Sequence, residues 1–204
     1  MKAIKMVFLI LIMPTHCLLT QVDSHFLTTL DAEIKKYQKG RTVYYSDRLG
    51  KAFIVSSIKA FSKNIIVSQY KNPEIDSIIL TKKEIRIIRK ELRSNKSFTW
   101  PDKLLANSKS VQSDSLISFV EKLNKNITDS LISLNEIDEW YNYYKNNLLY
   151  QSFSFSKPIY LRQHSVFLMF FSWYSQSGGS HELAFYKREN ELWRKWIVFD
   201  SGWW

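Results

Sequence analysis

The C-terminal stretch, residues 158–204, constrains the fold more than any other part of the chain. It reads PIYLRQHSVFLMFFSWYSQSGGSHELAFYKRENELWRKWIVFDSGWW, three apolar and aromatic runs separated by two turn-forming segments. This is the pattern of consecutive antiparallel strands. Residues 166–171 are apolar at every position, which predicts a central strand, buried on both faces, with helices packed on one side of the sheet. Pro158 has no N–H to donate and suits the start or the edge of a strand.

The segment after this central run predicts a flexible loop at residues 175–180, because it contains Gly178 and Gly179. Leu183 and Phe185 then alternate with their neighbours as in a strand with one buried face. The next turn, at residues 189–191, carries Glu191 where a tight two-residue hairpin favours Gly, so we expect a looser loop.

The closing strand is predicted at residues 192–199. Simple alternation divides its large side chains into two sets, with Trp193, Ile197 and Phe199 on one face and Trp196 and Val198 on the other. The terminal pair, Trp203 and Trp204, is expected to dock back on the sheet. The alternative is that the pair marks a surface for a partner.

The middle of the chain favours helices. Residues 25–39 carry apolar side chains at helical spacing and stop at Gly40. Residues 42–70 are rich in β-branched and aromatic side chains, which favours strands, although residues 51–61 fit a helix equally well. Two further helices are predicted, one from Ser113 or Asp114 to residues 124–126 and an aromatic-rich one over residues 134–148.

The clearest helix start is Thr81, because Glu84 follows three residues later and completes a capping box. The helix is expected to run to about Ser94. Its outer side carries the densest basic run of the chain: Lys82, Lys83, Arg86, Arg89, Lys90 and Arg93. A solvated helix face is the plain interpretation, and association with anionic lipid or nucleic acid is the alternative. Nucleic acid is the less favoured of the two, because no aromatic or amide side chains are interleaved for base contact.

Composition predicts one domain. The chain has 204 residues, of which 45% are hydrophobic, enough for a sizeable core. We therefore expect a single α+β domain over residues 21–204, with a helical N-terminal and middle part packed on a C-terminal antiparallel β-meander. The net charge of +10 favours anionic partners in general.

Residues 1–20 have the plan of a secretory or lipoprotein signal. Lys2 and Lys5 precede a short apolar run at residues 6–13, which is too short to span a bilayer. Cys17, the single cysteine, stands where a lipoprotein signal places its acylated residue; the alternative is cleavage near residues 17–21 and a free protein. We expect export to the periplasm or outer membrane, or secretion, with membrane contact only through that lipid.

The sequence contains few residues that match catalytic or metal-binding motifs. His181 and Glu182 begin a zinc-protease pattern, but Phe185 occupies the second His position, and G-x-S-x-G is absent. No metal site and no cofactor are expected. We predict a non-catalytic binding module of the cell envelope, with another envelope protein or an anionic surface as its partner. The alternative is a hydrolase that uses the 175–182 loop, with His181 paired to Glu182 or Asp200. The candidate binding residues are Tyr174, Ser177, Gly178, Gly179, His181, Trp203 and Trp204.

The order of elements over residues 79–204 also resembles small exported bacterial proteins to which no activity is attached. The resemblance is carried by LTKKE, FSKPIYLR, the Ser/Gly-rich loop and LAFYKRENELWRKW. It implies location and architecture only. Members of that group often have cysteines in the Gly loop, where this chain has Ser175, Ser177 and Ser180, so a disulfide or metal role of the loop is not implied here.

Overall fold

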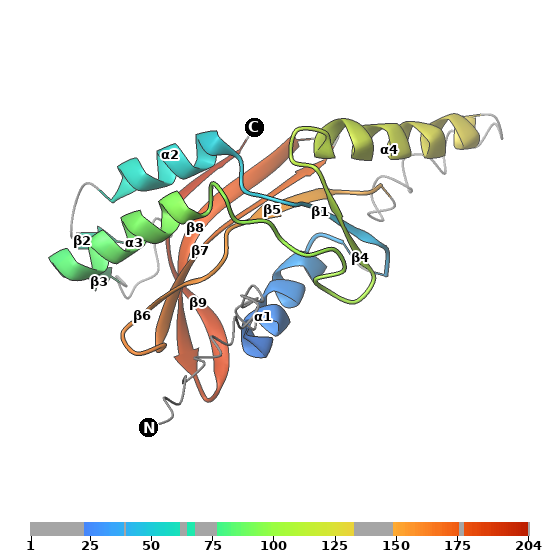
Figure 1. Ribbon diagram of the computed structural model, residues 1–204. Coiled ribbons are helices and arrows are strands. Elements are labelled where there is room, and N and C mark those ends of the chain that lie inside the picture. The colour runs from blue at the N-terminus through green and yellow to red at the C-terminus, as the bar shows by residue number, and fades with distance from the viewer. Residues whose placement is uncertain are drawn as a thin grey trace, which may run out of the picture.

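The computed structural model describes residues 23–38, 40–61, 65–67, 77–132, 149–175 and 178–203 (Figure 1). The predicted signal with Cys17, the predicted helix over residues 134–148, and the candidate residues Ser177 and Trp204 lie outside these ranges. The helices are α1 (Ser24–Lys35), α2 (Lys51–Ala60), α3 (Lys82–Ser94) and α4 (Leu116–Ile132). The strands are β1 (Val43–Ser46), β2 (Ile65–Val67), β3 (Ser77–Ile79), β4 (Ser108–Val111), β5 (Ser152–Phe155), β6 (Ile159–Leu161), β7 (Val166–Ser175), β8 (Gly178–Glu189) and β9 (Leu192–Trp203).

The main sheet is mixed, with the order β4-β1-β5-β7-β8-β9 and with β6 paired to β7. The β7–β8–β9 meander is antiparallel, so the α+β class is confirmed. The sheet nevertheless extends beyond the meander, because β1 pairs in parallel with both β4 and β5. The prediction that the N-terminal and middle parts are helices packed on the meander is therefore only partly right, since they also supply strands to the sheet.

Strand β7 lies at the centre of the sheet and is buried on both faces, as predicted for residues 166–171. Helices cover both faces, however, and not one (Figure 1). On one face, α1 packs against Phe167, Met169 and Phe171; on the other, α2 and α3 pack against Leu168 and Phe170. These two layers also explain why β8 is buried on both faces between Leu183 and Tyr186, where the sequence pattern predicted only one buried face.

The two hairpins of the meander are tighter than predicted. Ser175 belongs to β7 and pairs with Gly178, the first residue of β8, so the described part of the 175–180 segment is strand. Between β8 and β9 only Asn190 and Glu191 turn the chain, and their φ values of 48° and 65° are both in the left-handed region. A positive φ is strained for a residue such as Glu191. The hydrogen bonds between β8 and β9 on both sides of the turn fix the register and offset this local strain.

Strand β9 contains two bulges, and they overturn the predicted division of its side chains. The register against β8 shifts at two places, between Leu183 and Ala184 and between Phe185 and Tyr186. A bulge places two consecutive residues on one face. As a result Trp193 and Val198 belong to the α1 side, whereas Trp196, Ile197 and Phe199 belong to the α2–α3 side.

Packing decides three other expectations. Residues 51–60 form the helix α2, the alternative that the sequence left open beside a strand, because Ile54, Ser57 and Phe61 recur at helical spacing on the buried side. Helix α4 continues past Asn124, whose side chain bonds the backbone of Tyr150 and so does not compete with the helix. Trp203 does not dock, since 81% of its surface is exposed.

Helix α3 begins with the capping box that the sequence predicts. The Thr81 hydroxyl accepts from the Glu84 backbone N–H at 3.1 Å, and the Glu84 carboxylate accepts from the Thr81 N–H at 2.7 Å. The second carboxylate oxygen of Glu84 lies 3.0 Å from Arg162 Nε. Burial alone would raise the pKa of Glu84, but the Thr81 N–H and the Arg162 guanidinium outweigh it and hold this pKa below its usual value.

Substituting Glu84→Ala is expected to lower the free energy of unfolding at pH 7 by about 1–2 kcal/mol, because it removes half of the capping box and the Arg162 pair. A depressed folded-state pKa contributes stability above the unfolded pKa, and the contribution is lost as pH falls through the folded pKa. The difference between wild type and variant should therefore shrink at pH 3. Urea unfolding at both pH values checks this, and an undiminished difference at pH 3 would contradict it. Glu84→Gln, which preserves the box, isolates the charge effect.

Candidate functional site

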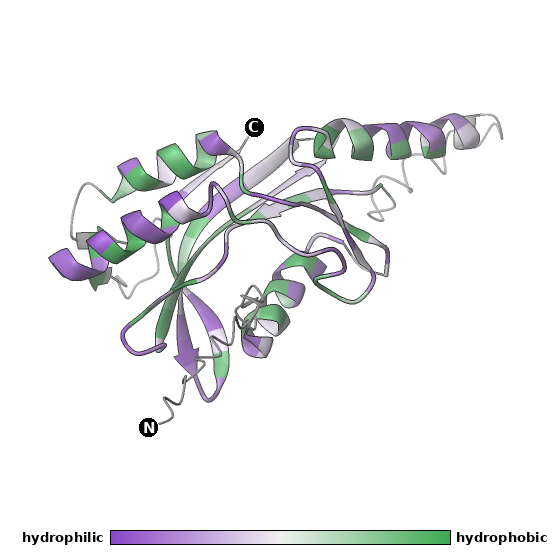
Figure 2. Ribbon diagram, in the orientation of Figure 1, coloured by the Kyte–Doolittle hydropathy of each residue, from purple (hydrophilic) through white to green (hydrophobic). Residues whose placement is uncertain are grey.

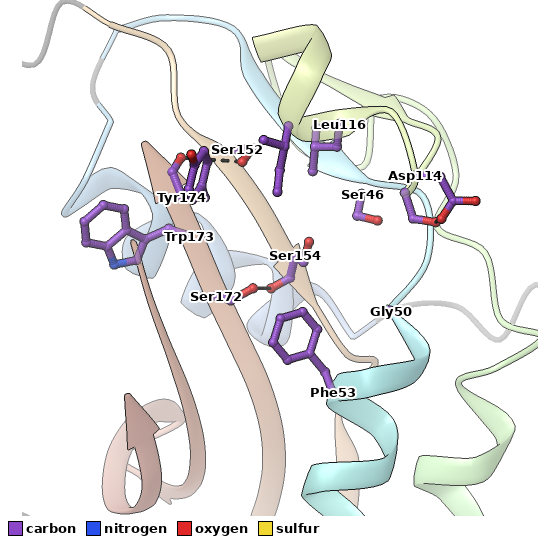
Figure 3. Close-up of a pocket in the computed structure, with 12 residues that line it drawn as sticks. Ser46, Gly50, Phe53, Asp114, Leu116, Ser152, Ser154, Ser172, Trp173 and Tyr174 are labelled. Carbon is purple, nitrogen blue, oxygen red and sulfur yellow. Dashed lines mark hydrogen bonds between the residues drawn. The ribbon is translucent and has the colours of Figure 1, made fainter. Parts of the chain in front are cut away.

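A pocket of about 390 Å³ opens on the sheet face that α2 and α3 cover, at the end where β1 leads into α2 and where α4 begins (Figure 3). It lies over β1, β5 and β7. Its lining comes from six separate segments: Ser46, Gly50, Phe53, Ser113, Asp114, Leu116, Ile117, Ser152, Ser154, Ser172, Trp173 and Tyr174.

The floor of the pocket is a row of serine hydroxyls. Ser154 on β5 pairs with Ser172 on β7. In the parallel pair of β1 and β5, Tyr45 lies opposite Phe153. The next residues along the two strands, Ser46 and Ser154, are therefore also neighbours. Residues opposite each other in a sheet share a face, so the three hydroxyls lie side by side on the floor. Because serine is small, this part of the sheet remains open while larger side chains fill the rest of the same face.

Among the serine hydroxyls that line the pocket, Ser46 Oγ donates to the Arg48 carbonyl at 2.5 Å, and two others bond weakly to backbone carbonyls of the neighbouring strand. Ser172 Oγ donates to the Ser154 carbonyl and Ser152 Oγ donates to the Tyr174 carbonyl, each at 3.4 Å (Figure 3). Such long bonds are at the weak end of the usual range, so a ligand can replace them at little cost. These hydroxyls can both donate to and accept from a bound molecule.

The walls are largely apolar, although Ser113 and Asp114 also line the pocket. Phe53 of α2 stands on one side and Leu116 and Ile117 of α4 on the other (Figure 3). Gly50, the N-cap of α2, also lines the pocket and supplies no side-chain cap to that helix. The arrangement is a polar floor beneath an apolar rim, which is typical of small-molecule sites.

Tyr174, one of the candidate binding residues, lines the pocket. Its hydroxyl donates to Glu121 on α4 at 3.3 Å. Burial, and then the negative charge of Glu121, raise the pKa of Tyr174 above its ordinary value. The phenol is therefore neutral at physiological pH. Trp173, the next residue along β7, points away to the opposite side of the sheet (Figure 3).

His181 packs against Phe53, a residue that lines the pocket, but is not itself part of the lining. Its ring lies 6.2 Å from the Phe53 ring and 6.1 Å from the Phe170 ring, measured between centroids. The imidazole also covers Gly202 on β9, where a Cβ atom would come within 2.7 Å of His181 Cε1. Glu182 points to the opposite face and pairs with Lys195. The structure therefore does not bring His181 and Glu182 together.

The other candidate binding residues are scattered. Gly179 pairs with Tyr174 at the end of the β7–β8 hairpin. Gly178 opens β8 with a φ of 126°, a conformation that only glycine adopts readily. Trp203 lies on the α1 side, edge-on to Trp173 with 6.2 Å between the ring centroids. These residues do not form one site with the pocket.

Sequence reasoning missed the serine floor and also missed a buried ionic cluster on the opposite face. Lys195 on β9 binds Glu33 of α1 at 2.9 Å and Glu182 of β8. Glu33 is only 5% exposed. The residues of the serine floor and of the ionic cluster are far apart in the sequence, so no local motif indicates either of them.

Among the described residues no group of three His, Cys, Asp or Glu side chains could hold a metal ion. In the same ranges no helix is long and apolar enough to cross a membrane. No protein-family model, curated protein or solved structure significantly matches the chain.

Proposed function

We propose that this chain is a non-catalytic binding protein of the cell envelope, and that the pocket over β1, β5 and β7 holds its ligand. The observation that carries the proposal is the row of Ser46, Ser154 and Ser172 beneath apolar walls. A sheet face fills with large side chains where only packing matters. Small hydroxyls at neighbouring positions on three strands instead maintain an open, hydrogen-bonding floor.

The lining specifies the chemical class of the ligand. A volume of about 390 Å³ lies within the range of small-molecule pockets. The apolar part of the ligand contacts Phe53, Leu116 and Ile117, and its hydroxyl or amide groups bond the serine floor. The described residues that line the pocket include no lysine or arginine, and the carboxylate of Asp114 among them disfavours an anionic ligand. We therefore propose a neutral, amphipathic small molecule.

The envelope part of the proposal rests on the signal-like pattern of residues 1–20, with Cys17 as the candidate lipid attachment site, and on the resemblance to exported bacterial proteins. An exported binding protein meets its ligand outside the cytoplasm. Acyl labelling of wild type and Cys17→Ser in a bacterial host distinguishes a lipid anchor from a free protein.

The pocket can be tested with the neutral amphipathic dye 6-propionyl-2-dimethylaminonaphthalene as the fluorescent probe. The double variant Ser154→Leu/Ser172→Leu fills the floor, and Ser110→Leu is the control, because Ser110 pairs with Tyr45 and lies on the opposite face. We expect wild type and control to enhance the dye fluorescence alike, and the filled variant to bind about tenfold more weakly or worse. Equal enhancement in all three folded proteins would contradict the proposal.

A hydrolase is the second candidate, and one observation favours it. Ser172 is the direct cross-strand partner of His181, so a nucleophile and a base share one face of the sheet. The Ser172 hydroxyl is directed at the Ser154 carbonyl, however, which is why binding is the preferred proposal. Labelling by a fluorophosphonate that is abolished in Ser172→Ala would establish the hydrolase, and an unlabelled wild-type protein would exclude a serine nucleophile.

A further inference from the structure

Helices α2 and α3 lie side by side over the same face of the sheet (Figure 1). Ile54 of α2 and Ile88 and Leu92 of α3 point inward to the shared core. The opposite sides of both helices therefore form one continuous outward surface, here termed the α2–α3 face. Its exposed charged residues are Lys51, Lys59, Lys82, Lys83, Arg86, Lys90 and Arg93.

The acidic residues of these two helices do not weaken this positive surface. Glu84 is turned toward β6 and binds Arg162, with 3.0 Å between carboxylate oxygen and Nε. Glu91 is partly exposed and binds Lys157 Nζ at 3.0 Å. Each carboxylate is thus neutralised by a cation from outside α2 and α3. The exposed charged residues of the two helices are therefore all cations, and hydrophilic stretches recur along α3 between hydrophobic ones (Figure 2).

An apolar side chain lies within the α2–α3 face. Val55 is 46% exposed and stands between Lys51 and Lys59 at the four-residue spacing that aligns side chains on one side of a helix. The remaining exposed residues of α2, Ala52 and Ser56, are small. On the α2–α3 face, long basic side chains therefore surround one exposed apolar side chain, that of Val55.

We propose that the α2–α3 face docks on an anionic phospholipid bilayer. Lysine and arginine near such a surface are attracted to its negative potential, and the attraction is cumulative. Surface-bound helices combine this attraction with apolar side chains that enter the headgroup region, the role that Val55 can fill. The exposed residues of α2 and α3 include no aromatic or amide side chain for base stacking or base contact, which favours a lipid surface over nucleic acid. This inference is independent of the pocket.

The test is co-sedimentation of the whole protein with vesicles of phosphatidylcholine, with and without about one third phosphatidylglycerol. The variant Arg86→Gln/Lys90→Gln/Arg93→Gln removes three cations from the face at little cost in helix propensity. The matched control is Lys109→Gln/Lys122→Gln/Lys125→Gln, which removes the same charge from exposed positions on β4 and α4. At about fivefold per charge, the face variant should bind anionic vesicles about 100-fold more weakly than wild type, and the control much less so.

Equal losses in the two triple variants would overturn the proposal, because net charge alone would then explain binding. So would equal binding to vesicles with and without phosphatidylglycerol. A DNA duplex at the same salt concentration provides the competing arm, and binding tighter than to anionic vesicles would replace the lipid proposal with a nucleic-acid surface. Val55→Ser separates the two further: it should weaken vesicle binding several-fold and leave any duplex binding unchanged.

Discussion

Substituting Lys195→Met is expected to lower the free energy of unfolding by about 3–5 kcal/mol, the largest effect of any single charge change considered for this protein. The Lys195 ammonium lies between the carboxylates of Glu33 and Glu182, whose side chains are 7% and 15% exposed. Removing the cation leaves the Glu33 carboxylate with Lys36 as its remaining partner, at 2.7 Å, and leaves the largely buried Glu182 carboxylate facing it with little water to solvate either group. Chemical denaturation at pH 7 measures the loss.

The control for Lys195→Met is Lys187→Met. Lys187 pairs with Glu189 at the surface, where its side chain is 43% exposed, so its removal should cost no more than about 1 kcal/mol. Adding Glu182→Gln to Lys195→Met should restore part of the stability, because one carboxylate then remains where two were facing each other. Equal losses in the Lys195 and Lys187 variants would show that the buried cluster does not hold α1 on the sheet.

The same cluster predicts an alkaline limit to stability. Burial alone would lower the pKa of Lys195, but the negative charges of Glu182 and Glu33 outweigh it and raise this pKa above its ordinary value. A raised folded-state pKa contributes stability that is fully present below the unfolded value and is lost as pH rises through the folded value. Wild-type stability should therefore fall above about pH 10.5, and the Lys195→Met variant should lack this component.

The second large effect is expected from Trp100→Ala, which should cost about 3–5 kcal/mol. Trp100 is 2% exposed, and its indole N–H donates to the Phe155 carbonyl at 3.0 Å. Its ring also lies 4.7 Å from the Phe98 ring and 5.2 Å from the Phe155 ring, measured between centroids. Trp100 thereby anchors the segment between α3 and β4 to the sheet. Removing its side chain leaves a cavity on the α1 side of the sheet.

Trp100→Phe separates the two contributions of this residue. Phenylalanine keeps most of the ring packing but leaves the buried Phe155 carbonyl without its indole donor, so an intermediate loss is expected. Trp203→Ala is the matched control, because Trp203 is 81% exposed and should change stability by no more than about 0.5 kcal/mol. A similar loss for Trp100→Ala and Trp203→Ala would contradict the packing described here.

Local patterns predicted the elements whose structure depends on neighbouring residues. The capping box at Thr81 requires only Glu84, three residues away, and it forms as predicted. The apolar run in β7 predicted its central position without knowledge of its partners, because burial on both faces excludes polar residues from every position. The α+β class followed from these elements.

Features that depend on distant partners were not predictable in the same way. The parallel pairing of β1 with β4 and β5 joins segments far apart in the chain, and nothing in the local sequence of β1 indicates which strands it pairs with. The bulges at Trp196 and Phe199 break the alternation from which facing side chains are inferred. The pocket was missed for the same reason, since Ser46, Ser154 and Ser172 become neighbours only when three strands pair.

The most direct test of a binding function is a fragment screen followed by NMR on the ¹⁵N-labelled protein. The proposal predicts that neutral amphipathic fragments shift the amide signals of Phe53, Ser154, Ser172 and Tyr174, and that Ser154→Leu/Ser172→Leu abolishes these shifts while preserving the rest of the spectrum. Fragments that bind only elsewhere on the protein, or that shift the same signals in the filled variant, would contradict it.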